Sequence, residues 1–147
     1  MHGIKRVVIP VDRSDASKVA TEQGAYLARL LGVDVVIINV SDSHRFVASV
    51  AIEERLMREN EAALEEFRRI AEAVGVGVNV TTRLVVGVPA DEIVKFVRDD
   101  DLIVMASHGK KGIDRFLLGS VSEEVLRRAP CSVMIIKPNV SGGVPLM

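Results

Sequence analysis

Residues 102–122 read LIVMASHGKKGIDRFLLGSVS, and this stretch decides how the chain folds. Apolar, partly β-branched residues fill positions 102–106, a glycine-containing loop opens with Ser-His-Gly at 107–109, and an amphipathic segment begins at Gly119 and Ser120. A strand, a glycine-containing loop and a helix start in this order are typical of phosphate-binding segments. Glycines let backbone N–H groups approach an anion closely, and a helix N-terminus adds unpaired N–H groups and the positive end of the helix dipole. The stretch therefore predicts an anion-binding site.

The start of this helix also fits an interpretation without a ligand. Ser120-Val121-Ser122-Glu123 matches a capping box, in which the Ser120 hydroxyl caps the helix and Glu123 reaches back to the Ser120 N–H. Gly119 would then only shape the entry of the chain into the helix. Spacing alone leaves the anion site and the capping box both open.

Outside this stretch, strand-like and helix-like patterns alternate. Apolar runs expected for strands occupy residues 4–11, 33–40, 102–106 and 131–137. Residues 76–86 alternate between apolar and polar, which indicates a strand at an edge of the sheet. Helical patterns lie between the strands, at 15–31, at 52–74, in a short segment from Pro89, and at 120–129. The sequence therefore predicts an α/β fold with a single, open, doubly wound, five-stranded parallel sheet and about four helices. We expect one domain over residues 1–138 and a flexible tail over 139–147.

The first helix carries clear start and stop signals. Ser14 or Asp15 is expected as its N-cap, and Gly32 is expected to end it. Its spacing predicts an inner face made of Val19, Ala20, Gln23, Gly24, Leu27, Leu30 and Leu31.

Composition excludes several classes of partner. The 147 residues carry a formal net charge of −1, which gives no bulk attraction to nucleic acid or to an anionic membrane, so neither is expected as a partner. The apolar run at the N-terminus is too short for a signal peptide and no stretch approaches a membrane span, so we expect a cytoplasmic protein. The single cysteine, Cys131, is expected to be a small buried hydrophobe rather than a nucleophile.

No protein-held metal site is expected. Histidines, the cysteine and carboxylates show no metal-ligand spacing. The acidic run Asp99-Asp100-Asp101 precedes the fourth strand, whereas ligands of open α/β sheets gather at the carboxyl ends of strands. We therefore expect these three carboxylates to form a solvated connector.

Residues 106–133 resemble the nucleotide-binding stretch of the universal stress protein family. ATP-binding members of that family have Gly, two residues, Gly, nine residues, Gly, then Ser or Thr. The second and third glycines and the hydroxyl fall here on Gly109, Gly119 and Ser120, and the first falls on Ala106, which adds a methyl group. The resemblance covers nearly the whole chain.

The resemblance implies the strand order 3-2-1-4-5, which agrees with the alternating pattern of the third strand. In that order the winding reverses between the first and fourth strands. Their following loops then open beside one another, in the crevice where such folds bind ligands.

The resemblance also implies ATP as the ligand, with Mg²⁺ on its phosphates. Asp12 would accept hydrogen bonds from ribose hydroxyls, and Val40 would contact adenine; the alternative for Asp12 is a turn aspartate that supports the cap of the following helix. His108 would flank the phosphates or brace its own loop. The complete set of expected nucleotide-binding residues is Pro10, Val11, Asp12, Val40, Ala106, His108, Gly109, Lys110, Gly119, Ser120, Val121 and Ser122.

These residues favour binding over catalysis. No nucleophile and base are paired at a recognisable spacing, so no catalytic residue is assigned. The first hypothesis is an ATP-binding stress-response or signalling module whose ATP state alters conformation or partner contacts. The alternatives are a slow ATPase and, because of Ala106, a dimeric scaffold of the same family that binds no nucleotide.

The last strand suggests an assembly. Residues 133–136, Val133-Met134-Ile135-Ile136, are apolar on both sides although the implied order places this strand at an edge. An open edge of this kind favours pairing with another chain. We expect a homodimer through this strand, as is common in the family.

Overall fold

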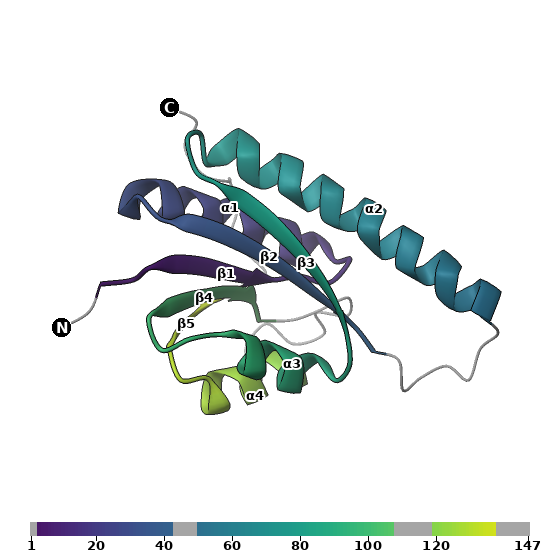
Figure 1. Cartoon of the computed structure of the whole chain (residues 1–147). Coiled ribbons are helices and arrows are strands. Elements are labelled where there is room, and N and C mark those ends of the chain that lie inside the picture. Colours follow the sequence, from purple (N-terminus) through teal and green to yellow (C-terminus); the bar gives the residue numbers. More distant parts are fainter. Residues whose placement is uncertain (1–2, 43–49, 108–118, 138–147) are drawn as a thin grey trace.

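A computed structural model describes residues 3–42, 50–107 and 119–137 of the chain. These residues form a five-stranded parallel sheet covered by helices on both faces (Figure 1). The elements are β1 (Arg6–Pro10), α1 (Asp15–Leu31), β2 (Asp34–Ser41), α2 (Val50–Val74), β3 (Val80–Val86), α3 (Pro89–Phe96), β4 (Asp101–Ala106), α4 (Ser120–Arg128) and β5 (Ser132–Ile136). The strand order β3-β2-β1-β4-β5 confirms the predicted fold class and order.

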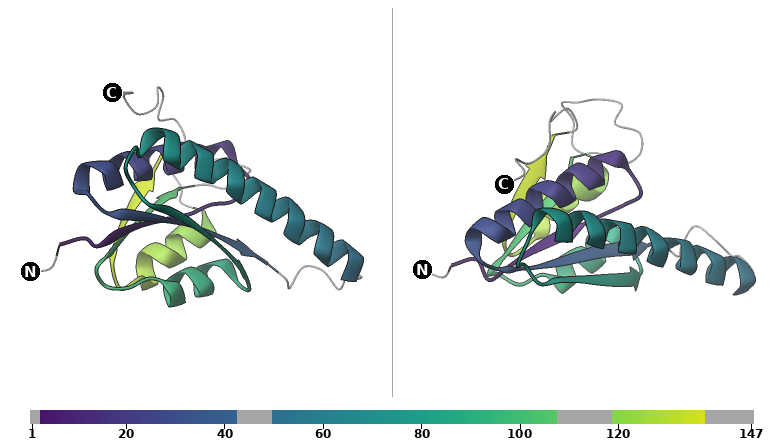
Figure 2. Two further views of the ribbon diagram at one scale, coloured as in Figure 1. Left: turned by 45° about the horizontal axis from the view of Figure 1, so that its top comes forward. Right: turned by 90° about the horizontal axis from the view of Figure 1, so that it is seen from above.

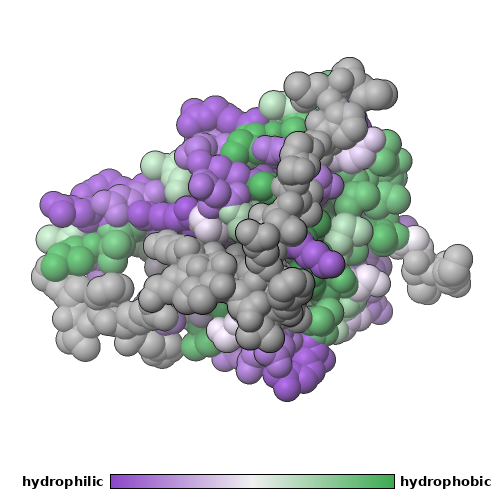
Figure 3. All heavy atoms as spheres, turned by 180° about the vertical axis from the view of Figure 1, so that it is seen from behind, coloured by the Kyte–Doolittle hydropathy of each residue, from purple (hydrophilic) through white to green (hydrophobic). Residues whose placement is uncertain are grey.

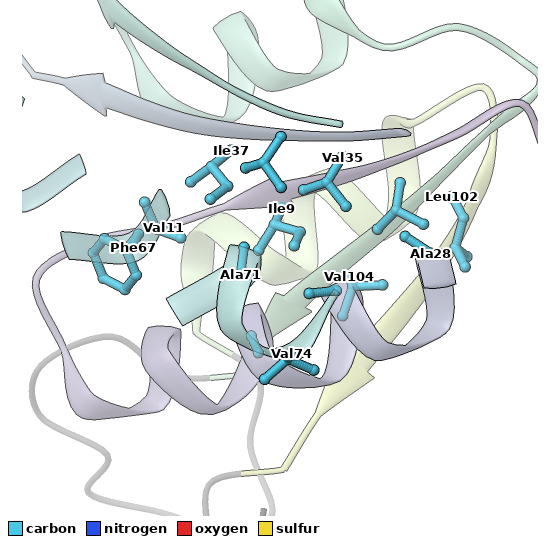
Figure 4. Close-up of a cluster of buried hydrophobic side chains, with 14 of the residues drawn as sticks. Ile9, Val11, Ala28, Val35, Ile37, Phe67, Ala71, Val74, Leu102 and Val104 are labelled. Atoms are coloured by element: carbon cyan, nitrogen blue, oxygen red, sulfur yellow. The ribbon is translucent and has the colours of Figure 1, made fainter. Parts of the chain in front are cut away.

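The two faces of the sheet bury separate cores. On one face, Val7 and Ile9 of β1 pack with residues of α1 and α2, among them Phe67 (Figure 4). On the other face, Val8 of β1 packs with residues of α3 and α4, including Val125. All three β1 residues are fully buried, because side chains of a strand alternate between two covered faces.

Helix α1 begins and ends as predicted, and its predicted inner face is confirmed at Ala20 and Gly24 but wrong at its last two leucines. Ser14 is its N-cap, and its side chain accepts a hydrogen bond from the Ser17 N–H; Gly32 ends it in the left-handed conformation, with φ of 68°. Leu30 and Leu31 were expected inside, yet they are 62% and 48% exposed. The buried residues are instead mostly small: Ser17, Ala20, Thr21, Gly24, Ala25 and Ala28.

Close packing of α1 on the sheet explains this error. A Cβ atom added at Gly24 would lie only 2.6 Å from Cδ1 of the fully buried Ile9. A helix that lies this close to the strands buries its small residues and leaves its large terminal leucines outside. Apolar spacing predicts the direction of the inner face but not how near the sheet lies.

Two element boundaries also differ from prediction. β3 begins at Val80 rather than at residue 76, because Gly77 adopts a positive φ of 84° and turns the chain before the strand starts. α2 begins at Val50, two residues before the predicted start, and its N-terminal half extends past the sheet (Figure 2). Figure 3 shows mainly hydrophilic side chains along this extension.

Among the described residues, no helix has both the length and the apolar content that crossing a membrane requires.

The prediction of a solvated acidic connector is wrong for Asp101. This residue is 2% exposed, and its carboxylate accepts hydrogen bonds from Arg6 Nε at 2.8 Å and Arg6 Nη2 at 3.1 Å. It also accepts one from the backbone N–H of Arg98 at 2.8 Å. Arg6 and Asp101 are direct neighbours in the pairing of β1 with β4. The contact joins residues far apart in sequence, so no local pattern indicates it.

This pair gives a stability prediction. Replacing Asp101 by Asn leaves the largely buried Arg6 guanidinium without its counter-charge, and we expect a loss of about 3 kcal/mol in the free energy of unfolding. Asp99→Asn, at an exposed neighbouring position, is the matched control and is expected to change stability by less than about 0.5 kcal/mol. Urea denaturation of both variants measures the difference. Equal effects would show that the pair contributes nothing specific.

Candidate functional site

The candidate site lies where β1 and β4 part. Pairing of β1 with β4 ends at Val8 and Ile103, whereas β1 stays paired with β2 as far as Pro10 and Ile38. Pro10 therefore sits where pairing on the β4 side has lapsed, a position that suits a residue without an N–H. The carboxyl ends of β1 and β4 are the point at which the winding of the sheet reverses, and open α/β sheets bind ligands at such points.

Asp12 follows β1 directly and is held by the start of α1. Its Oδ1 accepts hydrogen bonds from the Ser14 N–H at 2.8 Å and from the Ser17 hydroxyl at 2.9 Å. Its own N–H donates to Ser17 Oγ at 2.9 Å. The structure therefore shows the role of a turn aspartate that supports the helix start. This role occupies one carboxylate oxygen and leaves Oδ2 without a hydrogen bond from the described residues, so it is compatible with ligand binding.

Val11 and Val40 lie on opposite faces of the sheet. Val11 is buried in the core beneath α1 and α2, whereas the half-buried Val40 packs against the core beneath α3 and α4. Asn39 precedes Val40 in β2, and its Nδ2 donates to the Val11 carbonyl at 2.9 Å. The Asn39 Oδ1 atom is buried and has no hydrogen-bond partner. Such an acceptor is costly to leave unpaired, so it marks a position where a donor would be favourable.

The N-terminus of α4 is anchored to the end of β4. The Gly119 N–H donates to the Ser107 carbonyl at 2.6 Å, and the Ser122 hydroxyl donates to the same carbonyl at 2.9 Å and to the Gly119 carbonyl at 3.1 Å. The Ser107 N–H in turn donates to the carbonyl of Ile136 in β5 at 3.0 Å. These bonds place the first turn of α4 at the carboxyl edge of the sheet, beside the strand end expected to bind phosphate.

The capping-box interpretation of this helix start is wrong. Gly119, not Ser120, is the N-cap, and no side chain caps the helix. Ser120 is the first helical residue and is exposed. Glu123 lies 3.8 Å from Arg127 instead of reaching back to the Ser120 N–H. The Ser107 carbonyl already fixes Gly119, so the chain enters the helix one residue earlier than the capping box requires.

Ala106 is half-buried at the end of β4, and its methyl group packs against the core beneath α1 and α2. Ser107 follows it and was not singled out from the sequence. Ser107 is 4% exposed, and its hydroxyl has no hydrogen-bond partner among the residues that the structure describes. A buried, unpaired hydroxyl next to the α4 N-terminus is a second feature that favours a ligand here. Its position between the motif's first two expected glycine positions was the only available sequence signal.

The remaining predicted residues divide into two groups. Val121 packs its side chain against the core beneath α3 and α4, so only its backbone is available for binding. His108, Gly109 and Lys110 lie outside the described residues. Among the described residues, no group of histidine, cysteine or carboxylate side chains is arranged to hold a metal ion.

Cys131 does not belong to the candidate site. It is half-buried just before β5, and burial together with the nearby Asp101 charge raises the pKa of its thiol. A raised pKa lowers the thiolate fraction at neutral pH, so the thiol is a poor nucleophile.

A groove of about 420 Å³ lies elsewhere, between the ends of α3 and α4. One of the two cations that line it, Arg128, donates hydrogen bonds to Asp91 at 2.8 Å and Glu124 at 2.9 Å, and these carboxylates raise the pKa of the guanidinium. The groove contains none of the predicted nucleotide-binding residues, and its charges compensate each other, so it is a weaker candidate than the strand ends.

The two serines of the α4 start are expected to respond differently to mutation. Ser122→Ala removes a buried hydroxyl that is bonded to two carbonyls, and we expect it to lower the free energy of unfolding by about 1 to 2 kcal/mol. Ser120→Ala alters an exposed hydroxyl and is expected to change stability by less than about 0.5 kcal/mol. Chemical denaturation of both variants tests this difference. A larger loss for Ser120→Ala would instead support a capping role for that hydroxyl.

Comparison with known proteins matches this geometry to a family. The model of the universal stress protein family matches residues 3–137. A universal stress protein of Methanocaldococcus jannaschii is 40% identical over 141 residues, which cover 90% of this chain and 82% of that protein.

Solved structures of similar proteins include nucleotide complexes. A universal stress protein in complex with cAMP has a TM-score of 0.72 at 26% identity, covering 92% of this chain and 98% of the other. A universal stress protein from Archaeoglobus fulgidus in complex with dAMP has a TM-score of 0.69 at 27% identity, covering 93% of this chain and 100% of the other. The fold, the family match and the identity to these relatives agree, and the chain belongs to the universal stress protein family.

Proposed function

We propose that this protein is an adenine-nucleotide-binding stress-response module that binds ATP, with Mg²⁺ on the phosphates. The observation that supports the proposal is that Asp12 and the α4 N-terminus follow two adjacent strands, β1 and β4, at the point where the winding of the sheet reverses. A carboxylate acceptor suits ribose hydroxyls, and unpaired helix N–H groups suit phosphates. The site thus offers matching groups for both ends of a nucleotide.

The phosphate end is proposed to meet the first turn of α4. Backbone N–H groups of Ser120, Val121 and Ser122 would donate to phosphate oxygens, because the first N–H groups of a helix have no partner within it. The exposed Ser120 hydroxyl would add a donor, whereas the Ser122 hydroxyl is already engaged with carbonyls. The Ser107 hydroxyl, buried and unpaired, is a further donor at this end.

The adenosine end is proposed to meet β1 and β2. Asp12 Oδ2 would accept from the ribose and Val40 would contact the base, while Pro10 and Val11, whose side chains are buried, would line the site through their backbone. The cAMP and dAMP complexes of similar proteins support an adenine nucleotide as the ligand class. We propose that His108, Gly109 and Lys110 complete the phosphate site.

The methyl group of Ala106 does not argue against this site. It packs against the core beneath α1 and α2, so it occupies space that the core already uses. We therefore favour the nucleotide-binding module over a scaffold that binds no nucleotide.

We also propose that the protein is a homodimer that pairs through β5. This strand pairs with β4 on one side only, and Met134 on it is 38% exposed. A second copy pairing along residues 133–136 would satisfy the open edge. The ATP state would then alter contacts at this dimer interface or with other partners.

Nucleotide binding is tested by mass spectrometry of small molecules released from freshly purified protein, together with titration calorimetry using ATP and Mg²⁺. We expect adenine nucleotide near one per chain, or binding of added ATP. Gly119→Val places a branched side chain at the α4 N-cap, where phosphate would approach, and is expected to weaken ATP binding by about tenfold or more.

Gly3→Val is the matched control, since a Cβ at Gly3 has no atom within 4 Å, and it should bind ATP like the wild type. A wild type that is empty and does not bind ATP would contradict the proposal and leave the dimeric scaffold. Phosphate release in proportion to protein concentration would identify a slow ATPase.

The dimer is tested by light scattering coupled to size-exclusion chromatography. Wild type is expected at twice the 16.0 kDa mass of the chain. Met134→Lys places a charge on the open edge and is expected to give monomers. Val76→Lys, at a 70% exposed position before the opposite edge strand, should remain a dimer. A monomeric wild type would refute the assembly without affecting the nucleotide site.

A further inference from the structure

The Ser17 hydroxyl is bonded twice to the same residue, Asp12. It accepts a hydrogen bond from the Asp12 N–H at 2.9 Å and donates one to Asp12 Oδ1 at 2.9 Å. Ser17 is 3% exposed, so its hydroxyl is too buried to contact a ligand directly. These two bonds to Asp12 use the single proton of the Ser17 hydroxyl and one of its two lone pairs.

Ser17 is itself firmly held by the first turns of α1. Its N–H donates to the Ser14 hydroxyl at 3.2 Å, and its carbonyl accepts from the Thr21 hydroxyl at 2.8 Å. Thr21 is fully buried. A side chain anchored in this way on a helix offers a fixed point to whatever it binds, so Asp12 is held against a rigid element rather than within a free turn.

The two carboxylate oxygens of Asp12 consequently differ. Oδ1 accepts from both the Ser14 N–H and the Ser17 hydroxyl, whereas no described residue donates to Oδ2. Asp12 is half-buried near the carboxyl end of β1, so part of the residue is accessible to a ligand. A carboxylate is an acceptor only, and a fixed free acceptor favours ligands that carry hydroxyl donors.

We propose that Ser17 is a positioning residue that orients the Asp12 carboxylate, so that the site prefers nucleotides with free ribose hydroxyls. This inference rests on the proposed nucleotide site and adds that Asp12, oriented by Ser17, recognises the ribose hydroxyls of the ligand. Without the Ser17 hydroxyl, the carboxylate keeps only the Ser14 N–H as an anchor and must be ordered when ligand binds. Ordering a group on binding costs affinity, and pre-orientation removes that cost.

The test compares ATP with 2′,3′-dideoxy-ATP, which lacks both ribose hydroxyls, by titration calorimetry in the presence of Mg²⁺. Wild type is expected to bind ATP more tightly than the dideoxy nucleotide. Ser17→Ala is expected to lose about fivefold in affinity for ATP, the effect of about one hydrogen bond, while its affinity for the dideoxy nucleotide changes less than about twofold. The ratio of the two affinities therefore falls.

Gly32→Ala is the matched structural control. It strains the left-handed C-terminal end of α1 and destabilises the helix by about 1 kcal/mol, but it leaves Ser14, Ser17 and their hydrogen bonds to Asp12 in place. Its ratio of affinities should equal that of the wild type. If Ser17→Ala does not fold, Ser17→Cys, whose thiol is a weak donor, gives the same comparison.

The outcomes separate the inference from the proposal beneath it. A wild type that binds neither nucleotide overturns the proposed function and this inference together. A wild type that binds ATP while Ser17→Ala keeps the wild-type ratio overturns the inference alone, as does an equal loss of the ratio in Gly32→Ala, because that would reflect general destabilisation of α1.

Discussion

The fold depends on the parallel pairing of β1 with a neighbour on each side. Its residues Val7, Val8 and Ile9 are fully buried between two helical layers. Crossovers between parallel strands are right-handed. The connections from β1 through β2 to β3 therefore place α1 and α2 on one face of the sheet. The connection from β4 to β5 runs in the opposite direction across the sheet and places α4, beside α3, on the other face. The reversal beside β1 brings two loop-bearing strand ends to one edge. The candidate site is therefore a consequence of the topology.

The turn after β1 serves both folding and the proposed site. Three elements fix this turn. Ser17 of α1 binds Asp12, and Asn39 of β2 binds the Val11 carbonyl. Arg13 in the turn donates to Asn60 Oδ1 of α2 at 3.1 Å and to the neighbouring Glu59 of the same helix. A binding group that is already ordered loses less entropy when a ligand arrives. Hydrogen bonds that look purely structural can in this way set the affinity of a site.

Predictions from the sequence were correct where a residue acts through its own backbone or its near neighbours. Gly32 ends α1 because its left-handed conformation suits glycine, and Ser14 caps its start because its side chain reaches the Ser17 N–H three residues on. The errors arose where a distant residue changed the outcome. The Ser107 carbonyl fixed Gly119 as the N-cap in place of Ser120, and Arg6 drew Asp101 into a buried pair.

The sequence by itself determined the class of fold and the number and order of helices and strands along the chain, because hydrophobic periodicity and glycine and proline positions are local properties. The resemblance of residues 106–133 to a known nucleotide-binding stretch indicated the family. It also identified Asp12 and the residues 119–122 as candidates. Only the tertiary structure decided which oxygen of Asp12 remains available, which serine of α4 is buried and which is exposed, and how closely α1 approaches the sheet. These properties depend on hydrogen bonds and close contacts between segments far apart in the chain, and no local pattern encodes the distance between them.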